Sequence, residues 1–149
     1  MLTVLEKADL LQNVEIFRAV RTESLARIAA IAQELTFEAS RIIYRENEAP
    51  DAMFALLEGE VVLVRAGEEE QKLGEFQTAG AWALLAERPH SETARTTRPT
   101  HALSIDQQDL FDVMAEDFHV TRGILRALIE MGNLGDRLRD SRITAPDAS

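Results

Sequence analysis

The stretch from about residue 35 to about residue 105 is a succession of short apolar runs separated by turn residues. Gly59, Gly67 and Pro99 are among the residues that punctuate it. Short runs of bulky residues between frequent turn signals favour strands over helices. The expected strands are 35–38, 41–45, 53–57, 60–65, 71–76, 93–97 and 100–105, with a polar hairpin tip at 67–70. We therefore expect a mainly β fold, an antiparallel β-barrel or jelly roll of about eight strands.

Two helices are expected before the strands. Thr3 with Glu6 three residues later matches a capping box, and apolar residues then recur at helical spacing. The run breaks near Phe17, which we expect to be a buried anchor. A second helix is expected from Thr22, with an apolar stripe formed by Leu25, Ile28, Ala29 and Ala32.

Two further helices are expected after the strands. Asp106 can cap the first of them, with Asp109 in its first turn. The last is expected over 120–139, where apolar residues recur near a heptad spacing. Residues 140–149 are expected to be a disordered tail, so the chain should form a single domain over 1–139.

A glycine followed at once by a short helix-forming run lies between two of the expected strands. Gly80 precedes the run 82–87, and Pro89 ends it because proline cannot continue a helix. The first N–H groups of a helix have no partners inside it and can attract an anion. This pattern is common in loops and alone is a weak indication of a phosphate site.

The wider order Gly-x-x-Ala-Leu-Leu-x-x-x-Pro-x-x-x-Thr resembles the phosphate-binding cassette of cyclic nucleotide-binding domains. Residues 37–48 and 52–61 are similar to the family's first strands and hairpin, with Gly59 at the turn, although Ser40 and Asn47 replace two turn glycines. The resemblance covers about residues 10–139 and implies helices, a barrel with an inserted cassette helix, and two C-terminal helices. The matching cassette residues are Gly80, Ala83, Leu84, Leu85, Pro89 and Thr93.

Three departures fall on positions that hold the ligand in the family. The resemblance implies a glutamate that accepts the ribose 2′-hydroxyl where this chain has Ala81, and an arginine that pairs with the cyclic phosphate where it has His90. Glu92 takes a position occupied by a small residue in the family and would bring a carboxylate near the phosphate. The cassette is therefore degenerate, and binding of cAMP or cGMP is expected to be weak or lost.

The candidate ligand site follows from the matched positions. Two cations near the cassette, Arg88 and Arg95, are possible replacements for the missing arginine; alternatively, both are solvated or paired with neighbouring acids. Trp82 is expected to pack the short helix onto the barrel or, alternatively, to fill part of the nucleotide space. The candidate residues are Gly80, Ala81, Trp82, Ala83, His90, Ser91, Thr93, Arg88 and Arg95.

Composition argues against several other functions. The net charge of −10, from 26 acidic and 16 basic residues, disfavours a nucleic-acid surface. The absence of cysteine, of a signal peptide and of a long apolar run predicts a cytoplasmic protein that does not insert into a membrane. The three histidines, His90, His101 and His119, are too scattered for a metal site, and no catalytic motif is present, so we expect no metal and no enzyme activity.

Two functional hypotheses remain. The first is a non-enzymatic regulatory domain, with cAMP or cGMP as its possible ligand and no other cofactor. The resemblance implies that its C-terminal helices, from Asp106 onward, move when ligand binds. The second is a ligand-free interaction or oligomerisation module. Its last helix would form a homodimer or contact another domain, in association with a helical-repeat, transporter or signalling protein.

Overall fold

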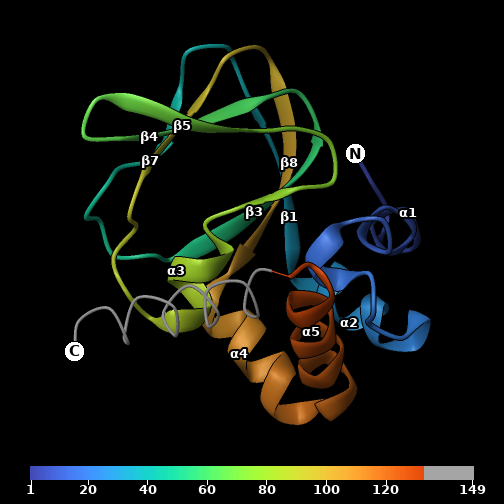
Figure 1. Ribbon diagram of the computed structural model, residues 1–149. Helices are drawn as coiled ribbons and strands as arrows, with labels where there is room; N and C mark the ends of the chain where they lie inside the picture. Colours follow the sequence, from blue (N-terminus) through green and yellow to red (C-terminus); the bar gives the residue numbers. More distant parts are fainter. Residues whose placement is uncertain (133–149) are drawn as a thin grey trace, which may run out of the picture.

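The computed structural model describes residues 1–132, in which helices from both ends of the chain gather at one end of a β-sandwich (Figure 1). No helix within these residues is both long enough and apolar enough to cross a bilayer. In chain order the elements are α1 (Val4–Leu11), η1 (Glu15–Phe17), α2 (Thr22–Ile31), β1 (Ala32–Phe37), β2 (Ile42–Tyr44), β3 (Ala52–Glu58), β4 (Val61–Arg65), β5 (Glu68–Leu73), β6 (Thr78–Ala79), α3 (Ala81–Ala86), β7 (Thr93–Thr96), β8 (Thr100–Asp106), α4 (Gln107–Glu116) and α5 (Phe118–Glu130).

Two four-stranded antiparallel sheets form the sandwich, with strand orders β1-β8-β3-β6 and β2-β7-β4-β5. The predicted jelly roll of about eight antiparallel strands is confirmed, as two facing sheets rather than one closed barrel. The apolar cluster contributed by both sheets comprises Tyr44, Phe54, Leu56, Val61, Leu63, Leu73, Ala79, Ala94 and Ala102.

Strand β3 carries a continuous apolar run because both of its faces are covered. Phe54 and Leu56 belong to the cluster between the sheets. Met53 and Ala55, which alternate with them, belong to a second cluster shared with the helices. Phe17, the expected anchor, is fully buried in that second cluster. The side chains of β3 therefore pack alternately into the cluster between the sheets and into the cluster shared with the helices.

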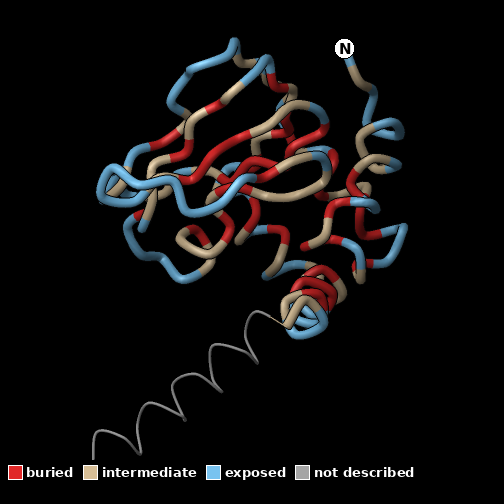
Figure 2. The backbone as a smooth tube through the Cα atoms, turned by 45° about the horizontal axis from the view of Figure 1, so that its top comes forward, coloured by how far each residue is buried: buried red, intermediate tan, exposed pale blue. Residues whose placement is uncertain are grey.

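Several elements differ from the sequence prediction. Ala32, expected on the stripe of the second helix, instead begins β1 directly after α2. The β4–β5 connection is the pair Ala66-Gly67, with φ of 51° and 82°, as in a type I′ turn, so β5 begins earlier than predicted, at Glu68. The short strand β6 was not predicted. Figure 2 shows the β4–β5 tip as an exposed loop, consistent with an edge strand protected by charge.

Two turns place residues other than glycine in the left-handed backbone region. Ser40 has φ 62° and Asn47 has φ 75°, at the two positions where the sequence departs from glycine. Asparagine tolerates this conformation well, whereas serine does so at some cost. The glycine is indispensable at Gly59, where φ is 110° and an added Cβ would lie 2.6 Å from the Cα of Thr100.

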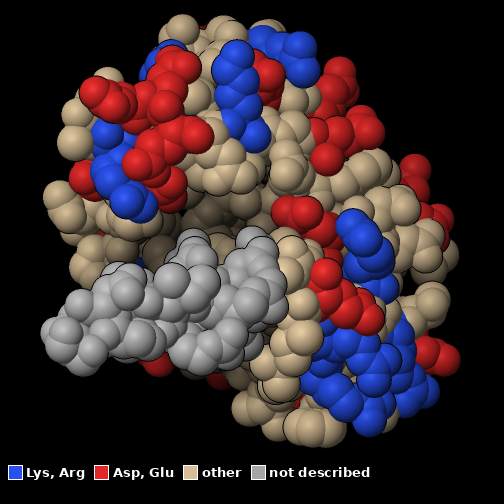
Figure 3. Space-filling view, in the orientation of Figure 1, with Lys and Arg blue, Asp and Glu red and all other residues tan. Residues whose placement is uncertain are grey.

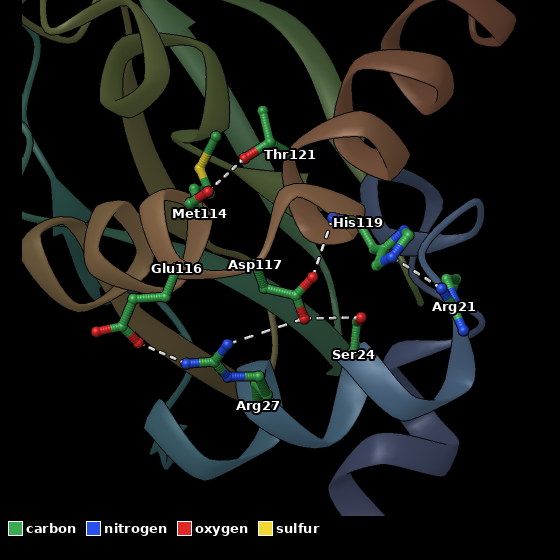
Figure 4. Close-up of polar contacts among 8 residues, drawn as sticks. All are labelled: Arg21, Ser24, Arg27, Met114, Glu116, Asp117, His119 and Thr121. Carbon is green, nitrogen blue, oxygen red and sulfur yellow. Dashed lines mark hydrogen bonds and ion pairs between the residues drawn. The ribbon is translucent and has the colours of Figure 1, made fainter.

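A polar network fastens α2 to the junction of α4 and α5 (Figure 4). Asp117 caps α5: its Oδ1 accepts the N–H of His119 at 3.0 Å, and its Oδ2 accepts the hydroxyl of Ser24 at 2.8 Å. The Ser24 bond is the first cause that holds the pKa of the Asp117 carboxyl below its ordinary value. Arg27 of α2 pairs with Glu116 of α4 at 2.5 Å. The C-terminal helices are therefore tied to an N-terminal helix rather than only to the sheet.

The two C-terminal helices match their predicted starts more closely than their predicted end. Asp106 caps α4, accepting the N–H of Asp109 at 3.0 Å, as expected. Helix α5 ends at Glu130, and Gly132 has φ 79°, so the helix predicted over 120–139 is shorter. Residues 133–139 of that prediction, and the predicted tail at 140–149, lie outside the described residues.

Candidate functional site

The cassette is built around a glycine in the left-handed backbone conformation, which residues with a side chain rarely adopt. Gly80 has φ 84° and joins β6 to α3. An added Cβ would lie 3.1 Å from Cε1 of His90 and 3.2 Å from Cε2 of Tyr44. Glu87 ends α3 with φ 54°, and the chain then turns back toward β7. The glycine therefore lets the start of the cassette approach the loop that follows it.

A cavity of about 350 Å³ lies between the cassette and the facing strands β4 and β5. This volume is in the range of small-molecule sites, about 300–1,000 Å³. Figure 3 shows a hollow on this face beside a group of acidic side chains near the β4–β5 hairpin. The lining residues are Glu15, Tyr44, Leu63, Arg65, Gln71, Leu73, Thr78, Gly80, Ala81, Trp82, Ala83, His90, Ser91, Glu92 and Met131.

Six of the nine candidate residues from the sequence line this cavity, namely Gly80, Ala81, Trp82, Ala83, His90 and Ser91. The other three lie elsewhere. Thr93 begins β7, and its Oγ1 accepts the N–H of Glu46, in the turn after β2, at 2.9 Å. Arg95 pairs with Glu69 at 3.5 Å, and Arg88 is exposed after α3. The structure thus brings the cassette residues together, and it leaves Arg88 and Arg95 outside the cavity lining, one exposed and one paired, as the alternative interpretation of them expected.

His90 is held firmly in the place where the family pattern has its arginine. Its side chain is 4% exposed and stacks on Tyr44, with 3.7 Å between ring centroids and 13° between planes. Its backbone oxygen accepts the N–H of Asn47 at 2.7 Å, and its own N–H donates to the backbone oxygen of Glu48 at 2.9 Å. Burial lowers the pKa of the imidazole, and Asp51 and Glu48 only partly oppose this. At neutral pH the ring is therefore uncharged and supplies no cation to the cavity.

Arg65 lines the cavity and was not among the candidates from the sequence. It lies at the end of β4, and its Nε donates to the backbone oxygen of Ser91 at 3.3 Å. The same Nε is 3.6 Å from Oε1 of Glu70 on β5. The signal available in the sequence was strand alternation, since Leu63 and Arg65 are two residues apart and share a face. Only the pairing of β4 with β5 and β7 shows that this face meets the cassette.

Two carboxyl groups also line the cavity. Burial is the main cause that raises the pKa of Glu92, followed by a hydrogen bond shared with Glu70, while Arg65 acts in the opposite direction. Burial also raises the pKa of Glu15, with Arg18 opposing. Glu92 in turn adds to the raised pKa of the Tyr44 hydroxyl, which burial causes in the first place. With two carboxyl groups and one guanidinium, the described lining of the cavity does not carry the net positive charge that would favour an anion.

Trp82 lines the cavity and is partly buried, a position compatible with both roles expected for it. Within residues 1–132, no group of three or more histidine, cysteine or acidic side chains is arranged to hold a metal ion. The chemistry of the site is thus that of a small polar cavity with aromatic walls, one guanidinium and acidic neighbours.

Comparison with known proteins places this geometry in context. The cyclic nucleotide-binding domain family matches residues 34–117. The potassium channel KAT2 of Arabidopsis thaliana is 29% identical over 142 residues, which are 93% of this chain and 20% of the channel. This chain therefore spans only a fifth of that relative.

Two solved structures show the same fold. The regulatory domain of Toxoplasma gondii PKA, in co-crystal with cAMP, has a TM-score of 0.69 and 18% identity, covering 72% of this chain and 44% of that chain. The regulatory subunit of a cAMP-independent protein kinase A from Trypanosoma cruzi, bound to guanosine, has a TM-score of 0.67 and 19% identity, covering 72% and 39%. Proteins bound to cAMP and to guanosine share the fold, so the fold alone does not determine the ligand.

Proposed function

The chain belongs to the cyclic nucleotide-binding domain family, and we propose that it is a non-enzymatic regulatory domain with weak affinity for cAMP and cGMP. The observation that carries this proposal is the cavity of about 350 Å³, which is lined by the cassette residues from Gly80 to Ser91. A cytoplasmic setting belongs to the same proposal, because the chain has no cysteine that would call for an oxidising compartment.

Weak affinity follows from the chemistry of the cassette. Ala81 offers no acceptor for a ribose hydroxyl, and the neutral ring of His90 offers no charge to a phosphate. Each charge-assisted hydrogen bond contributes about 1.5–3 kcal/mol. The loss of two corresponds to a factor on the order of 10² to 10⁴ in the dissociation constant. A ligand that is micromolar elsewhere in the family would be roughly millimolar here.

The test is a titration with cAMP and cGMP that follows Trp82 fluorescence and the melting temperature. Trp82 is the single tryptophan and lines the cavity, so its emission reports directly on occupancy. We expect a saturable change only at millimolar nucleotide. Saturation at micromolar nucleotide would contradict the weak affinity, and no change at millimolar nucleotide would contradict binding of these two ligands.

A second candidate function is an interaction or oligomerisation module, and the surface of α5 favours it. Phe118, Leu125 and Ile129 are 68%, 51% and 56% exposed. Their spacing of seven and four residues places them on one face of the helix. We propose that this face contacts a second copy or another protein domain. Sedimentation of the wild type against a Leu125→Glu, Ile129→Glu variant tests the homodimer: a wild-type monomer, or a dimer that survives the substitutions, would contradict it.

A further inference from the structure

We infer that Arg65 binds the anionic group of a nucleotide in this cavity, and that Glu70 and Glu92 compete with that anion for its guanidinium. The inference rests on the proposed function, because it concerns the same cavity and names the residue that would replace the missing arginine of the cassette.

The position of the Arg65 guanidinium supports a role in binding an anion. Among the described residues lining the cavity, Arg65 is the single arginine or lysine. Its Nε reaches the backbone oxygen of Ser91, the residue next to His90. The guanidinium of Arg65, at the end of β4, thus lies beside the part of the cassette where the family pattern has its phosphate-binding arginine. A forked guanidinium suits a phosphate from either direction of approach.

The carboxyl groups of Glu70 and Glu92 are the groups that would compete with the anion for Arg65. Oε1 of Glu70 lies 3.6 Å from Nε of Arg65, and both Glu70 and Arg65 are close enough to Glu92 to act on its pKa, in opposite directions. Oε1 of Glu92 also lies 3.4 Å from the hydroxyl of Ser91. Two carboxylates and one guanidinium together carry a net negative charge when ionised. An arriving phosphate therefore meets repulsion as well as attraction, and its binding has to displace these contacts.

The surroundings of Glu92 determine how this competition changes with pH. The titratable groups that face it are Arg65 from β4, Glu70 from β5 and the Tyr44 hydroxyl from β2. Burial, and after it the neighbouring Glu70, raise the pKa of the Glu92 carboxyl, so Glu92 gains a proton more readily than an exposed carboxylate. Once it holds that proton, one negative charge is gone and Arg65 is freer to accept a phosphate. Nucleotide affinity therefore rises as the pH falls through the raised pKa of Glu92.

The experiment measures cAMP binding by calorimetry and Trp82 fluorescence in the wild type, Glu92→Gln and Glu69→Gln. Glu69→Gln is the matched control, because Glu69 lies on β5 next to Glu70, pairs with Arg95, and does not line the cavity. At pH 7.5 we expect Glu92→Gln to bind cAMP about tenfold more tightly than the wild type, the effect of removing one close like charge. Glu69→Gln should not change the affinity. The pH dependence should be smaller in Glu92→Gln than in the wild type.

Arg65 itself is tested in the Glu92→Gln background. Adding Arg65→Gln should abolish the gain, and adding Arg65→Lys should keep part of it because the charge remains. Arg65 is half exposed, and circular dichroism checks that each variant is folded. Adenosine, which has no phosphate, should gain nothing from Glu92→Gln. A gain that survives Arg65→Gln, or that adenosine shares, would overturn the inference.

The inference and the proposed function fail in distinguishable ways. Weak cAMP binding by the wild type that neither Glu92→Gln nor Arg65→Gln changes would refute the role of Arg65 and leave the proposed function standing. Binding by Glu92→Gln that depends on Arg65, with no binding by the wild type even at low pH, would refute weak nucleotide binding as the natural function but uphold Arg65 as the anion-binding residue. No binding by any variant would refute both.

Discussion

The imidazole of His90 lies face to face with the phenol ring of Tyr44, 3.7 Å away between centroids. This contact joins the cassette loop to β2 and fills the space beside Gly80. The histidine is therefore part of the packing of the loop, in addition to lining the cavity. Its replacement changes the stability of the fold and the charge of the site together, and the two effects have to be measured separately.

The burial of His90 predicts a pH dependence of stability. Burial lowers the pKa of its imidazole in the folded chain, whereas the unfolded chain has the ordinary value of about 6.5. Below that value the unfolded chain takes up a proton that the folded chain resists, so the free energy of unfolding should fall as the pH drops from about 7 to about 5. Urea unfolding of the wild type and His90→Gln over this range measures the difference. Parallel pH profiles for the two proteins would contradict the prediction.

Restoring the family residues should restore affinity. The triple variant Ala81→Glu, His90→Arg, Glu92→Ala regains a ribose acceptor and a phosphate cation and loses a repelling carboxylate. We expect its affinity for cAMP to exceed that of the wild type by a factor on the order of 10² to 10⁴. Calorimetry provides the measurement, and Glu92→Ala alone separates the lost repulsion from the added contacts. A folded triple variant with wild-type affinity would show that the scaffold itself has lost the site.

Gly59 should be among the least replaceable residues of the chain. An added Cβ would lie 2.6 Å from the Cα of Thr100 and 2.7 Å from the backbone oxygen of Pro99, at a φ of 110°. Strain and overpacking together should lower the free energy of unfolding of Gly59→Ala by about 2–6 kcal/mol. Gly74→Ala is the control, because nothing lies within 4 Å of its added Cβ, and its effect should be within about 0.5 kcal/mol. Equal losses in the two variants would contradict this account.

Gly123 should be needed for the packing of α5 although glycine is a poor helix former. An added Cβ would lie 2.7 Å from Cγ2 of Val20 and 3.0 Å from the backbone oxygen of Ala19. Alanine gains about 1 kcal/mol of helix propensity, but overpacking costs typically about 1–3 kcal/mol. Gly123→Ala should therefore lower the melting temperature, whereas Leu125→Ala on the exposed side of the same helix should hardly change it. A more stable Gly123→Ala would show that the helix can shift away from Val20.

Much of the fold could be predicted because its signals are local. The capping box of Thr3 and Glu6 forms as expected, with bonds of 2.8 and 3.1 Å. Short runs of bulky residues between frequent turn residues indicated the jelly roll without knowledge of the strand pairing. Local signals were insufficient where the backbone overrides propensity. Ala66 enters a left-handed turn that alanine disfavours, so the start of β5 was misplaced.

The site was less predictable because its members meet across the sheets. The cassette residues follow one another in sequence, and six of them line the cavity. Arg65 lies on a strand that sequence alone gave no reason to place beside Ser91, and the partner of Arg95 became visible only when β5 and β7 were seen on either side of β4. Charge alone could not distinguish an arginine in the cavity from one engaged outside it.

The helices leave the sheet without connecting loops, and this has a mechanical consequence. α2 runs directly into β1, β8 runs directly into α4, and Ala32 lies opposite Ile105 where the two strands pair. Asp117 and Ser24 then join the far ends of the same helices. The two strands and their helices thus form a closed loop of rigid parts without a free hinge. A displacement of α5 would therefore be transmitted to α2 through the contact of Asp117 with Ser24.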